Sequence, residues 1–312
     1  MNYILNAKTM STCMIGTWAW GAGLNGSKMV FGKSYGVDQL RETFEKAYSL
    51  GFDFWDTAEV YGMGNAEKLL GSFIKNKDVI ISTKHRPSKH YKEGENLKAI
   101  KKSFVRLGIS CIDLYWLHAP LSIADNMKEL AECQKAGLIK SIGLSNGSTL
   151  QIKLADDTLR ANGSKLDAIQ NHFSLLSFER EKATLEYCKN NNILYFGYMI
   201  LEQGALSGHY NEMNHFSTFS FRGLMFNKQK FHKIQPLLDN MKQLSLKYSV
   251  DASQIPITWA ISKGVIPIVG LTKPKHVESL KEGMSNQLSS AEIADLEQSA
   301  ISSGVVCKAF WE

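Results

Sequence analysis

The sequence predicts an α/β protein built as one (β/α)8 TIM barrel, with residues 1–312 forming a single domain. Three observations predict this fold class. Short apolar segments alternate regularly with amphipathic helical segments, which is the pattern of parallel strands joined by right-handed crossovers. Eight such units fit the 312-residue chain, a usual length for a closed barrel. No Pro-, Gly- or Ser-rich linker divides the sequence, so we expect one closed sheet rather than two domains.

The elements follow from local patterns taken in chain order. Runs of apolar residues predict strands at 14–18, 52–56, 79–84, 112–118, 139–144, 167–170, 194–198 and 265–269. Helical spacing of apolar residues predicts helices at 37–50, 66–74, 96–107, 125–136, 150–161, 179–190, 228–248, 251–263, 275–282 and 289–300. The last of these are additional C-terminal helices, and a short N-terminal hairpin fits before residue 14.

Several local signals set the ends of these elements. Gly51 and Gly137 follow predicted helices and are expected to end them. The segments 251–254 and 289–292 have the spacing of capping boxes and predict helix starts. Residues 199–227 form a long irregular stretch rich in Gly, Phe, Met and Asn, and loops of that length are usually functional or disordered.

Composition excludes several classes of protein. The five cysteines are scattered without a CxxC spacing, so we expect reduced thiols in a cytoplasmic protein and no zinc or other metal site. No apolar run approaches the roughly 20 residues of a membrane span, and the N-terminus lacks a secretory pattern. The net charge is +6, but the basic runs at 98–102 and 273–275 are short. A solvated helix face explains the first run better than nucleic-acid binding does.

A glycine-rich segment at residues 21–26 matches the GxGxxG pattern of dinucleotide-binding open sheets. That fingerprint requires a helix to begin inside the motif. Residues 27–33 are loop-like here, and the first helix is predicted to start near Val37. We therefore interpret the segment as a glycine-rich loop at the barrel mouth.

Polar residues stand at the carboxyl ends of the predicted strands, which all face one mouth in a barrel of this kind. They are Asp56, Lys84, His118, Ser145, Asn146, Gln170 and Tyr198, with Tyr61 on the loop after the second strand. Any one of them alone suits an ordinary rim position. Together, at consecutive strand ends, they predict an active site.

The chemistry that these residues suit is proton donation to a carbonyl oxygen. A free phenol has a pKa of about 10 and is a weak acid near neutrality. The Lys84 ammonium would stabilise the phenolate of Tyr61 and lower its pKa, and Asp56 would keep Lys84 charged and oriented. His118 could hydrogen-bond the same oxygen. The chain supplies no hydride, so a reduction demands a nicotinamide cofactor.

The motifs that carry these residues resemble the aldo-keto reductase superfamily. The resemblance rests on Asp56-Thr57-Ala58, Tyr61-Gly62, Glu67, Lys84 in ISTK, His118 in LYWLHAP, Gly143-Leu144-Ser145-Asn146 and Gln170, and it extends over about residues 16–288. It implies a barrel that binds NADPH across its mouth and a catalytic tetrad of Asp56, Tyr61, Lys84 and His118. In that tetrad Tyr61 is the general acid, Lys84 and Asp56 tune it, and His118 orients the carbonyl. We expect Glu67 to be structural.

The resemblance also implies the residues that hold the cofactor. Ser145, Asn146 and Gln170 would bind the carboxamide, and Tyr198 would stack on the nicotinamide ring. The GALSG segment, with Gly204, Leu206 and Gly208, matches the stretch near the pyrophosphate. The 2′-phosphate would lie at the last strand–helix junction, at Gly270, Thr272, Lys273 and His276. There Thr272 is expected to cap the helix and free N–H groups to face the phosphate. His276 stands where the family usually has arginine, so NADPH is favoured and NADH stays an alternative.

The substrate side is predicted to be apolar. Trp18 and Trp20 would flank the mouth, and Phe219 would come from the long loop after the seventh strand. Trp116 suits either the pocket or the core, and His172 suits the rim. This lining fits hydrophobic or aromatic aldehydes and ketones, a small-molecule carbonyl substrate. The sequence is also compatible with a homo-oligomer.

Two other functions fit parts of the pattern. A regulatory module that resembles channel-associated β-subunits would bind NADPH with little turnover. A metal-dependent hydrolase would need several His or Asp residues at the strand ends, and only Asp56 and His118 qualify. Turnover of NADPH with carbonyl compounds separates the first alternative from a reductase, and bound metal would favour the second.

Overall fold

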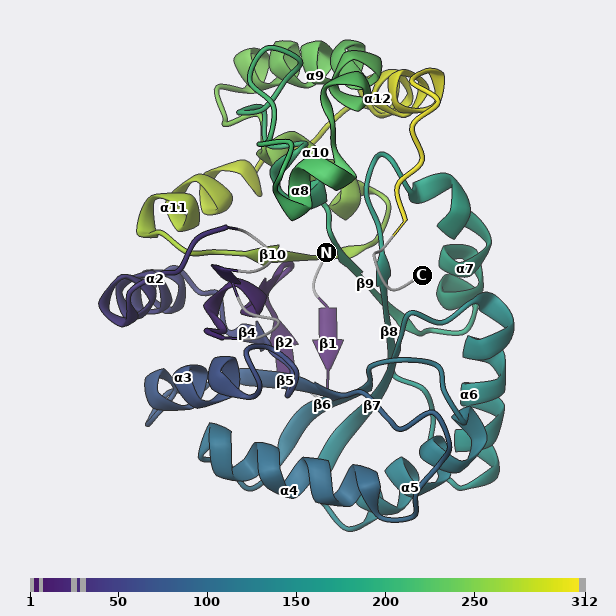
Figure 1. Cartoon of the computed structure of the whole chain (residues 1–312). Helices are drawn as coiled ribbons and strands as arrows, with labels where there is room; N and C mark the ends of the chain where they lie inside the picture. The colour runs from purple at the N-terminus through teal and green to yellow at the C-terminus, as the bar shows by residue number, and fades with distance from the viewer. Residues whose placement is uncertain (1–2, 6–7, 24–26, 29–31, 309–312) are drawn as a thin grey trace.

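The computed structural model describes residues 3–5, 8–23, 27–28 and 32–308, and its centre is a closed barrel of eight parallel strands (Figure 1). The strands in barrel order are β3 (Met14–Gly16), β4 (Phe54–Asp56), β5 (Ile80–His85), β6 (Ile112–Leu117), β7 (Ile139–Ser145), β8 (Ala168–His172), β9 (Leu194–Tyr198) and β10 (Ile266–Gly270). β10 pairs with β3 and closes the sheet. The predicted (β/α)8 fold class is confirmed.

A hairpin precedes the barrel, as expected. β1 (Tyr3–Leu5) pairs antiparallel with β2 (Lys8–Met10). Leu5 and Met10 are buried against residues of the barrel interior, and the Ser11 N–H donates to the Asp53 carboxylate, just before β4, at 3.2 Å. The hairpin therefore covers the amino ends of the strands and leaves the opposite end of the barrel for the site.

Helices surround the barrel on its outer side (Figure 1). They are α2 (Val37–Ser49), α3 (Asn65–Phe73), α4 (Glu95–Leu107), α5 (Ile123–Lys135), α6 (Thr149–Ala161), α7 (Phe178–Asn190), α8 (Phe221–Met225), α9 (Lys228–Tyr248), α10 (Gln254–Ser262), α11 (Pro274–Gly283) and α12 (Ser290–Ser302). Most of these helices are amphipathic and turn their apolar faces inward, whereas α10 is buried on nearly all sides and α12 packs on α9. Within the described ranges, no helix is long and apolar enough to cross a membrane.

Some predicted boundaries were wrong. The first barrel strand ends at Gly16, and Trp18–Trp20 forms a 3-10 turn, η1. The expected capping box at residues 251–254 does not form, because the cap of α10 is Ser253. The box at Ser289 and Glu292 is confirmed. Ser27 and Lys28 are helical rather than loop. Residues 24–26 of the glycine-rich segment and residues 29–31 of the stretch after it lie outside the described residues.

Large aromatic side chains fill the barrel interior. The Trp116 ring lies edge-on to Phe196, with centroids 5.5 Å apart, and Phe196 lies edge-on to Phe54 at 5.7 Å. A Cβ on Gly143 would lie 2.1 Å from the Trp116 ring, so only glycine fits there. Of the two positions that the sequence allowed for Trp116, the substrate pocket and the core, the structure shows the core.

A buried ion pair joins α3 to α4. The Glu67 side chain is inaccessible to solvent, accepts a hydrogen bond from Thr83 Oγ1 at 2.7 Å, and pairs with the Arg106 guanidinium. These contacts join two helices and a strand, in keeping with the expectation that Glu67 is structural.

Candidate active site

The loop that follows β4 places Tyr61 at the barrel mouth. Gly62, Met63 and Gly64 all have positive φ, at 56°, 55° and 87°, which turns the chain back toward α3. A Cβ on Gly62 would lie 2.4 Å from the Ala22 carbonyl oxygen, so glycine permits a close approach of two loops. The Tyr61 ring stacks on Trp18, with centroids 6.1 Å apart. The tyrosine is therefore held in a fixed position.

A buried carboxylate–ammonium pair lies beneath Tyr61. Lys84 and Asp56 are 1% and 2% exposed and form a short ion pair. Lys84 Nζ also donates to the Thr57 carbonyl at 2.9 Å, and Ser82 Oγ donates to Asp56 at 2.6 Å. Removing two charges from water costs several kcal/mol unless their hydrogen-bonding capacity is satisfied, and these contacts satisfy it.

His118, the remaining member of the predicted tetrad, completes the arrangement around the Tyr61 hydroxyl. Lys84 Nζ lies 3.4 Å from the Tyr61 hydroxyl. The His118 ring lies edge-on to Tyr61, with centroids 6.2 Å apart and an interplanar angle of 83°. The structure thus brings Asp56, Tyr61, Lys84 and His118 together around one hydroxyl.

The pKa of Tyr61 shifts in the opposite direction to the one expected from the sequence. Burial raises the pKa of Tyr61 well above its usual value, and the negative charge of Asp56 adds to the shift. Burial also lowers the pKa of Lys84, against the opposing effect of Asp56. Because Asp56 neutralises the field of Lys84, the ammonium does not outweigh desolvation of the phenolate. Tyr61 is therefore a protonated phenol near neutrality and keeps a proton to donate.

His118 is a neutral imidazole. Burial is the main cause that lowers its pKa well below 6.5, and Lys84 and Arg86 lower it further. Its Nδ1 atom is buried and has no hydrogen-bond partner among the described residues. A neutral imidazole can donate an N–H to an oxygen without adding charge to the site.

This shift predicts how stability depends on pH. The folded protein binds a proton at His118 less readily than the unfolded chain, so unfolding takes up a proton below about pH 6.5. Stability should fall as the pH falls, by up to about 1.4 kcal/mol per pH unit from this group. His118→Asn should weaken that dependence. Urea unfolding of both proteins at about pH 7 and about pH 5 measures it, and equal losses in the two proteins would contradict the prediction.

The residues predicted to hold a carboxamide form one connected set. Asn146 Nδ2 donates to the His118 carbonyl at 3.0 Å, Ser145 Oγ donates to the Gln170 carbonyl at 2.9 Å, and the Tyr198 hydroxyl donates to Asn146 Oδ1 at 2.6 Å. Gln170 Nε2 reaches Asp56 at 3.3 Å. The set offers amide hydrogen-bond donors and acceptors beside the Tyr198 ring. A ligand that carries an amide group on an aromatic ring could hydrogen-bond to the former and stack on the latter.

The GALSG segment begins in the 3-10 turn η2 (Glu202–Gly204). Gly204 and Gly208 have φ values of 104° and 78°, and the Leu206 side chain is buried in the core. Arg222, on α8, donates to the Gln203 carbonyl at 3.3 Å and lies over the Phe216 ring at 4.5 Å. Sequence reasoning missed Arg222, because a lone arginine in an aromatic loop carries no motif.

The junction between β10 and α11 suits an anion, but the predicted helix cap was wrong. Thr272 does not cap α11; the cap residue is Lys273, and no side-chain cap bond is formed among the described residues. The first N–H groups of α11 therefore keep their capacity for a ligand. Lys273 and His276 lie at the surface. Partial desolvation, together with the charges of Lys273 and Lys275, lowers the pKa of His276. A Cβ on Gly270 would meet the Gly16 carbonyl oxygen at 3.9 Å, an ordinary van der Waals contact.

The predicted substrate residues fall in three different environments. Trp18 is half-buried on Tyr61, as expected for a mouth residue. Trp20 is 4% exposed, packs on Trp55 and Phe73, and donates to the Leu271 carbonyl at 2.7 Å, so it is a core residue. Phe219 is 98% exposed and lines no described surface of the site.

His172 is not a rim residue either. It is 2% exposed and bonds to Glu202, with Nε2 and Oε1 2.7 Å apart. Its ring stacks on Tyr198. The sequence does not predict a role for Glu202, because a carboxylate in an irregular stretch is usually solvent-exposed.

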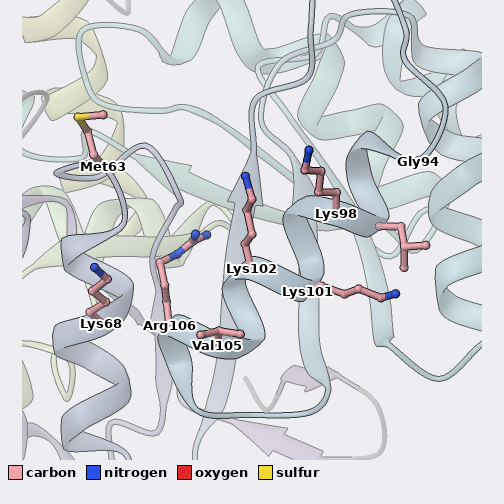
Figure 2. Close-up of a pocket in the computed structure, with 9 residues that line it drawn as sticks. Met63, Lys68, Gly94, Lys98, Lys101, Lys102, Val105 and Arg106 are labelled. Atoms are coloured by element: carbon pink, nitrogen blue, oxygen red, sulfur yellow. The ribbon is translucent and has the colours of Figure 1, made fainter.

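A groove of about 700 Å³ lies on the outer side of the barrel, between α3 and α4, and no tetrad residue lines it. Its lining residues are Met63, Lys68, Gly94, Leu97, Lys98, Lys101, Lys102, Val105 and Arg106. Figure 2 shows that the basic side chains do not converge, since Lys101 points away from Lys68. The exposed lysines of α4 are a solvated helix face, as predicted.

Known proteins with similar sequences belong to one family. The model of the aldo/keto reductase family matches residues 13–301. The chain is 30% identical over 313 residues to the chloroplastic pyridoxal reductase of Arabidopsis thaliana, covering 94% of this chain and 84% of that protein. It is 28% identical over 311 residues to the aldo-keto reductase yakc [NADP(+)] of Schizosaccharomyces pombe, covering 92% and 90%.

Solved structures agree in fold. A glycerol dehydrogenase from Gluconobacter oxydans superposes with a TM-score of 0.82 at 23% identity, over 96% of this chain and 94% of that one. An aldo/keto reductase from Klebsiella pneumoniae, solved with NADP and acetate, has a TM-score of 0.70 at 20% identity, over 94% and 92%. With its barrel, its four converging residues and a family match over nearly its whole length, this chain belongs to the aldo/keto reductase family.

Proposed function

We propose that this protein uses NADPH to reduce aldehydes or ketones to alcohols, with Tyr61 as the proton donor. The observation that carries the proposal is the contact between the Tyr61 hydroxyl and Lys84 Nζ, at 3.4 Å, above a lysine that Asp56 and Thr57 hold in place. A protonated phenol next to a fixed cation can release its proton as negative charge develops on a neighbouring oxygen.

Each residue has a distinct part in the step. The Tyr61 O–H bond breaks and its proton passes to the carbonyl oxygen, while the nearby Lys84 ammonium stabilises the resulting phenolate. Asp56 keeps Lys84 charged and oriented. His118, as a neutral donor, holds the carbonyl oxygen beside the Tyr61 hydroxyl. NADPH, when bound, supplies the hydride that the carbonyl carbon gains, so the C=O group becomes CH–OH.

The residues present suit a nicotinamide cofactor. Ser145, Asn146 and Gln170 carry amide and hydroxyl groups that complement a carboxamide, and Tyr198 offers a ring beside them. The start of α11 would hold the 2′-phosphate, with Lys273 as its cation. The fission yeast relative, whose name includes NADP(+), supports NADPH, and NADH stays the weaker alternative.

Lys273→Ala should reveal this phosphate site. We expect the KM for NADPH to rise about tenfold, the equivalent of one charge-assisted hydrogen bond, while the KM for NADH stays unchanged. Steady-state kinetics with both cofactors measures it. Lys275→Ala, two residues on, is the matched comparison. An equal rise for both cofactors after Lys273→Ala would place the phosphate elsewhere.

Turnover tests the proposed function as a whole. The loss of NADPH absorbance should follow the addition of aromatic or hydrophobic carbonyl compounds, with pyridoxal included because a relative is a pyridoxal reductase. Saturable turnover is expected. Tight NADPH binding without turnover across the panel would instead favour a regulatory module.

A further inference from the structure

A buried pair of polar side chains, His172 and Glu202, lies behind Tyr198 and has no part in the proton path. His172 ends β8 and stands opposite Tyr198, which ends the neighbouring strand β9 (Figure 1). The two rings are stacked, with centroids 5.7 Å apart and an interplanar angle of 18°. The side chains of His172 and Glu202 are 1% and 2% exposed, so this pair interacts with neighbouring protein groups and not with solvent.

Glu202 is surrounded by donors. It accepts from His172 at 2.7 Å and from the Ser174 hydroxyl. The Cys307 thiol also faces it, and burial raises the pKa of that thiol, with the Glu202 charge adding to the shift. An apolar group would usually occupy such a place at lower desolvation cost. The carboxylate therefore needs an explanation beyond packing.

The backbone after Tyr198 gives that explanation. Met199, Glu202 and Gln203 have positive φ values of 62°, 46° and 54°, a sparsely populated region for residues with side chains. Such conformations persist where the surroundings over-determine them. The Glu202 side chain ties this turn to β8, just before the segment with Gly204 and Gly208.

We propose that His172 and Glu202 are positioning residues for the nicotinamide half of the cofactor, an inference that rests on the proposed function. Asn146 holds the Tyr198 hydroxyl at 2.6 Å, and His172 supports one face of the ring. The opposite face is the one that meets the nicotinamide. Glu202 fixes the plane of His172 and the start of the GALSG loop at the same time.

Calorimetric binding of two ligands tests the inference. NADPH engages both halves of the site, whereas adenosine 2′,5′-bisphosphate engages only the adenine half. His172→Gln, which removes the ring but keeps an N–H donor, should weaken NADPH binding about tenfold, the upper range for one aromatic contact. Binding of the bisphosphate should stay within about twofold. Glu202→Ala should behave like His172→Gln, and Glu202→Gln, which keeps an acceptor oxygen, should restore NADPH binding.

Glu186→Ala, on the exposed face of α7, is the matched control and should bind both ligands normally. Far-ultraviolet circular dichroism checks that each variant folds. If Glu202→Ala does not fold, the binding data for His172→Gln alone test the inference. Equal losses for both ligands, or no loss for either, would overturn the inference. Wild-type protein that binds neither ligand would overturn the proposed function, and the inference with it.

Discussion

Tyr61→Phe is expected to lower kcat for carbonyl reduction by about 10²- to 10⁴-fold, the range that one general acid contributes. The substitution removes only the hydroxyl that contacts Lys84 at 3.4 Å. The ring stays, so the stacking on Trp18 persists. NADPH binding, measured by quenching of tryptophan fluorescence, should stay within about twofold of wild type.

Tyr187→Phe is the matched control, because Tyr187 lies on α7, outside the barrel mouth. It should leave both kcat and NADPH binding unchanged. Undiminished turnover in Tyr61→Phe would remove Tyr61 from its proposed role. Loss of NADPH binding in the same variant would show that Tyr61 contributes to the cofactor site instead.

Arg106→Met should destabilise the fold by about 3–5 kcal/mol, because it leaves a buried charge without its partner. Glu67 is fully buried, and Arg106 pairs with it between α3 and α4. Thr83 alone would then hydrogen-bond the carboxylate. Urea unfolding at neutral pH measures the loss.

Two comparisons make this measurement specific. Lys102→Met lies on the exposed face of the same helix and should change stability by less than about 0.5 kcal/mol. The double variant Glu67→Gln with Arg106→Met should recover part of the loss, since the uncompensated charge is gone. A single Arg106→Met variant as stable as wild type would show that the pair contributes nothing.

The barrel and the tetrad were accessible from sequence for one physical reason. Parallel strands bury both faces, so their apolar runs are visible, and their carboxyl ends meet at one mouth. Asp56 and Lys84 come at such ends, and the structure joins them. The order of polar residues along the chain therefore maps onto neighbouring positions in space.

Features that depend on packing between distant segments were not accessible. Trp20 was expected to flank the mouth after the first strand, but the 3-10 turn at Trp18–Trp20 directs its side chain into the core. His172 and Glu202 are separated by 30 residues and meet only because β8 and β9 are neighbours. The direction of the Tyr61 pKa shift likewise depends on the burial of its hydroxyl in the folded barrel, to which the nearby Asp56 charge adds.

Transfer of a labelled hydride tests the central claim most directly. NADPH deuterated at its transferable position, incubated with this protein and an aromatic aldehyde or pyridoxal, should yield an alcohol that carries one deuterium on the former carbonyl carbon. Mass spectrometry of the product detects it, and Tyr61→Phe should form it far more slowly. Bound NADPH with no deuterium in the product of any carbonyl compound offered would contradict the assignment of this protein as a carbonyl reductase.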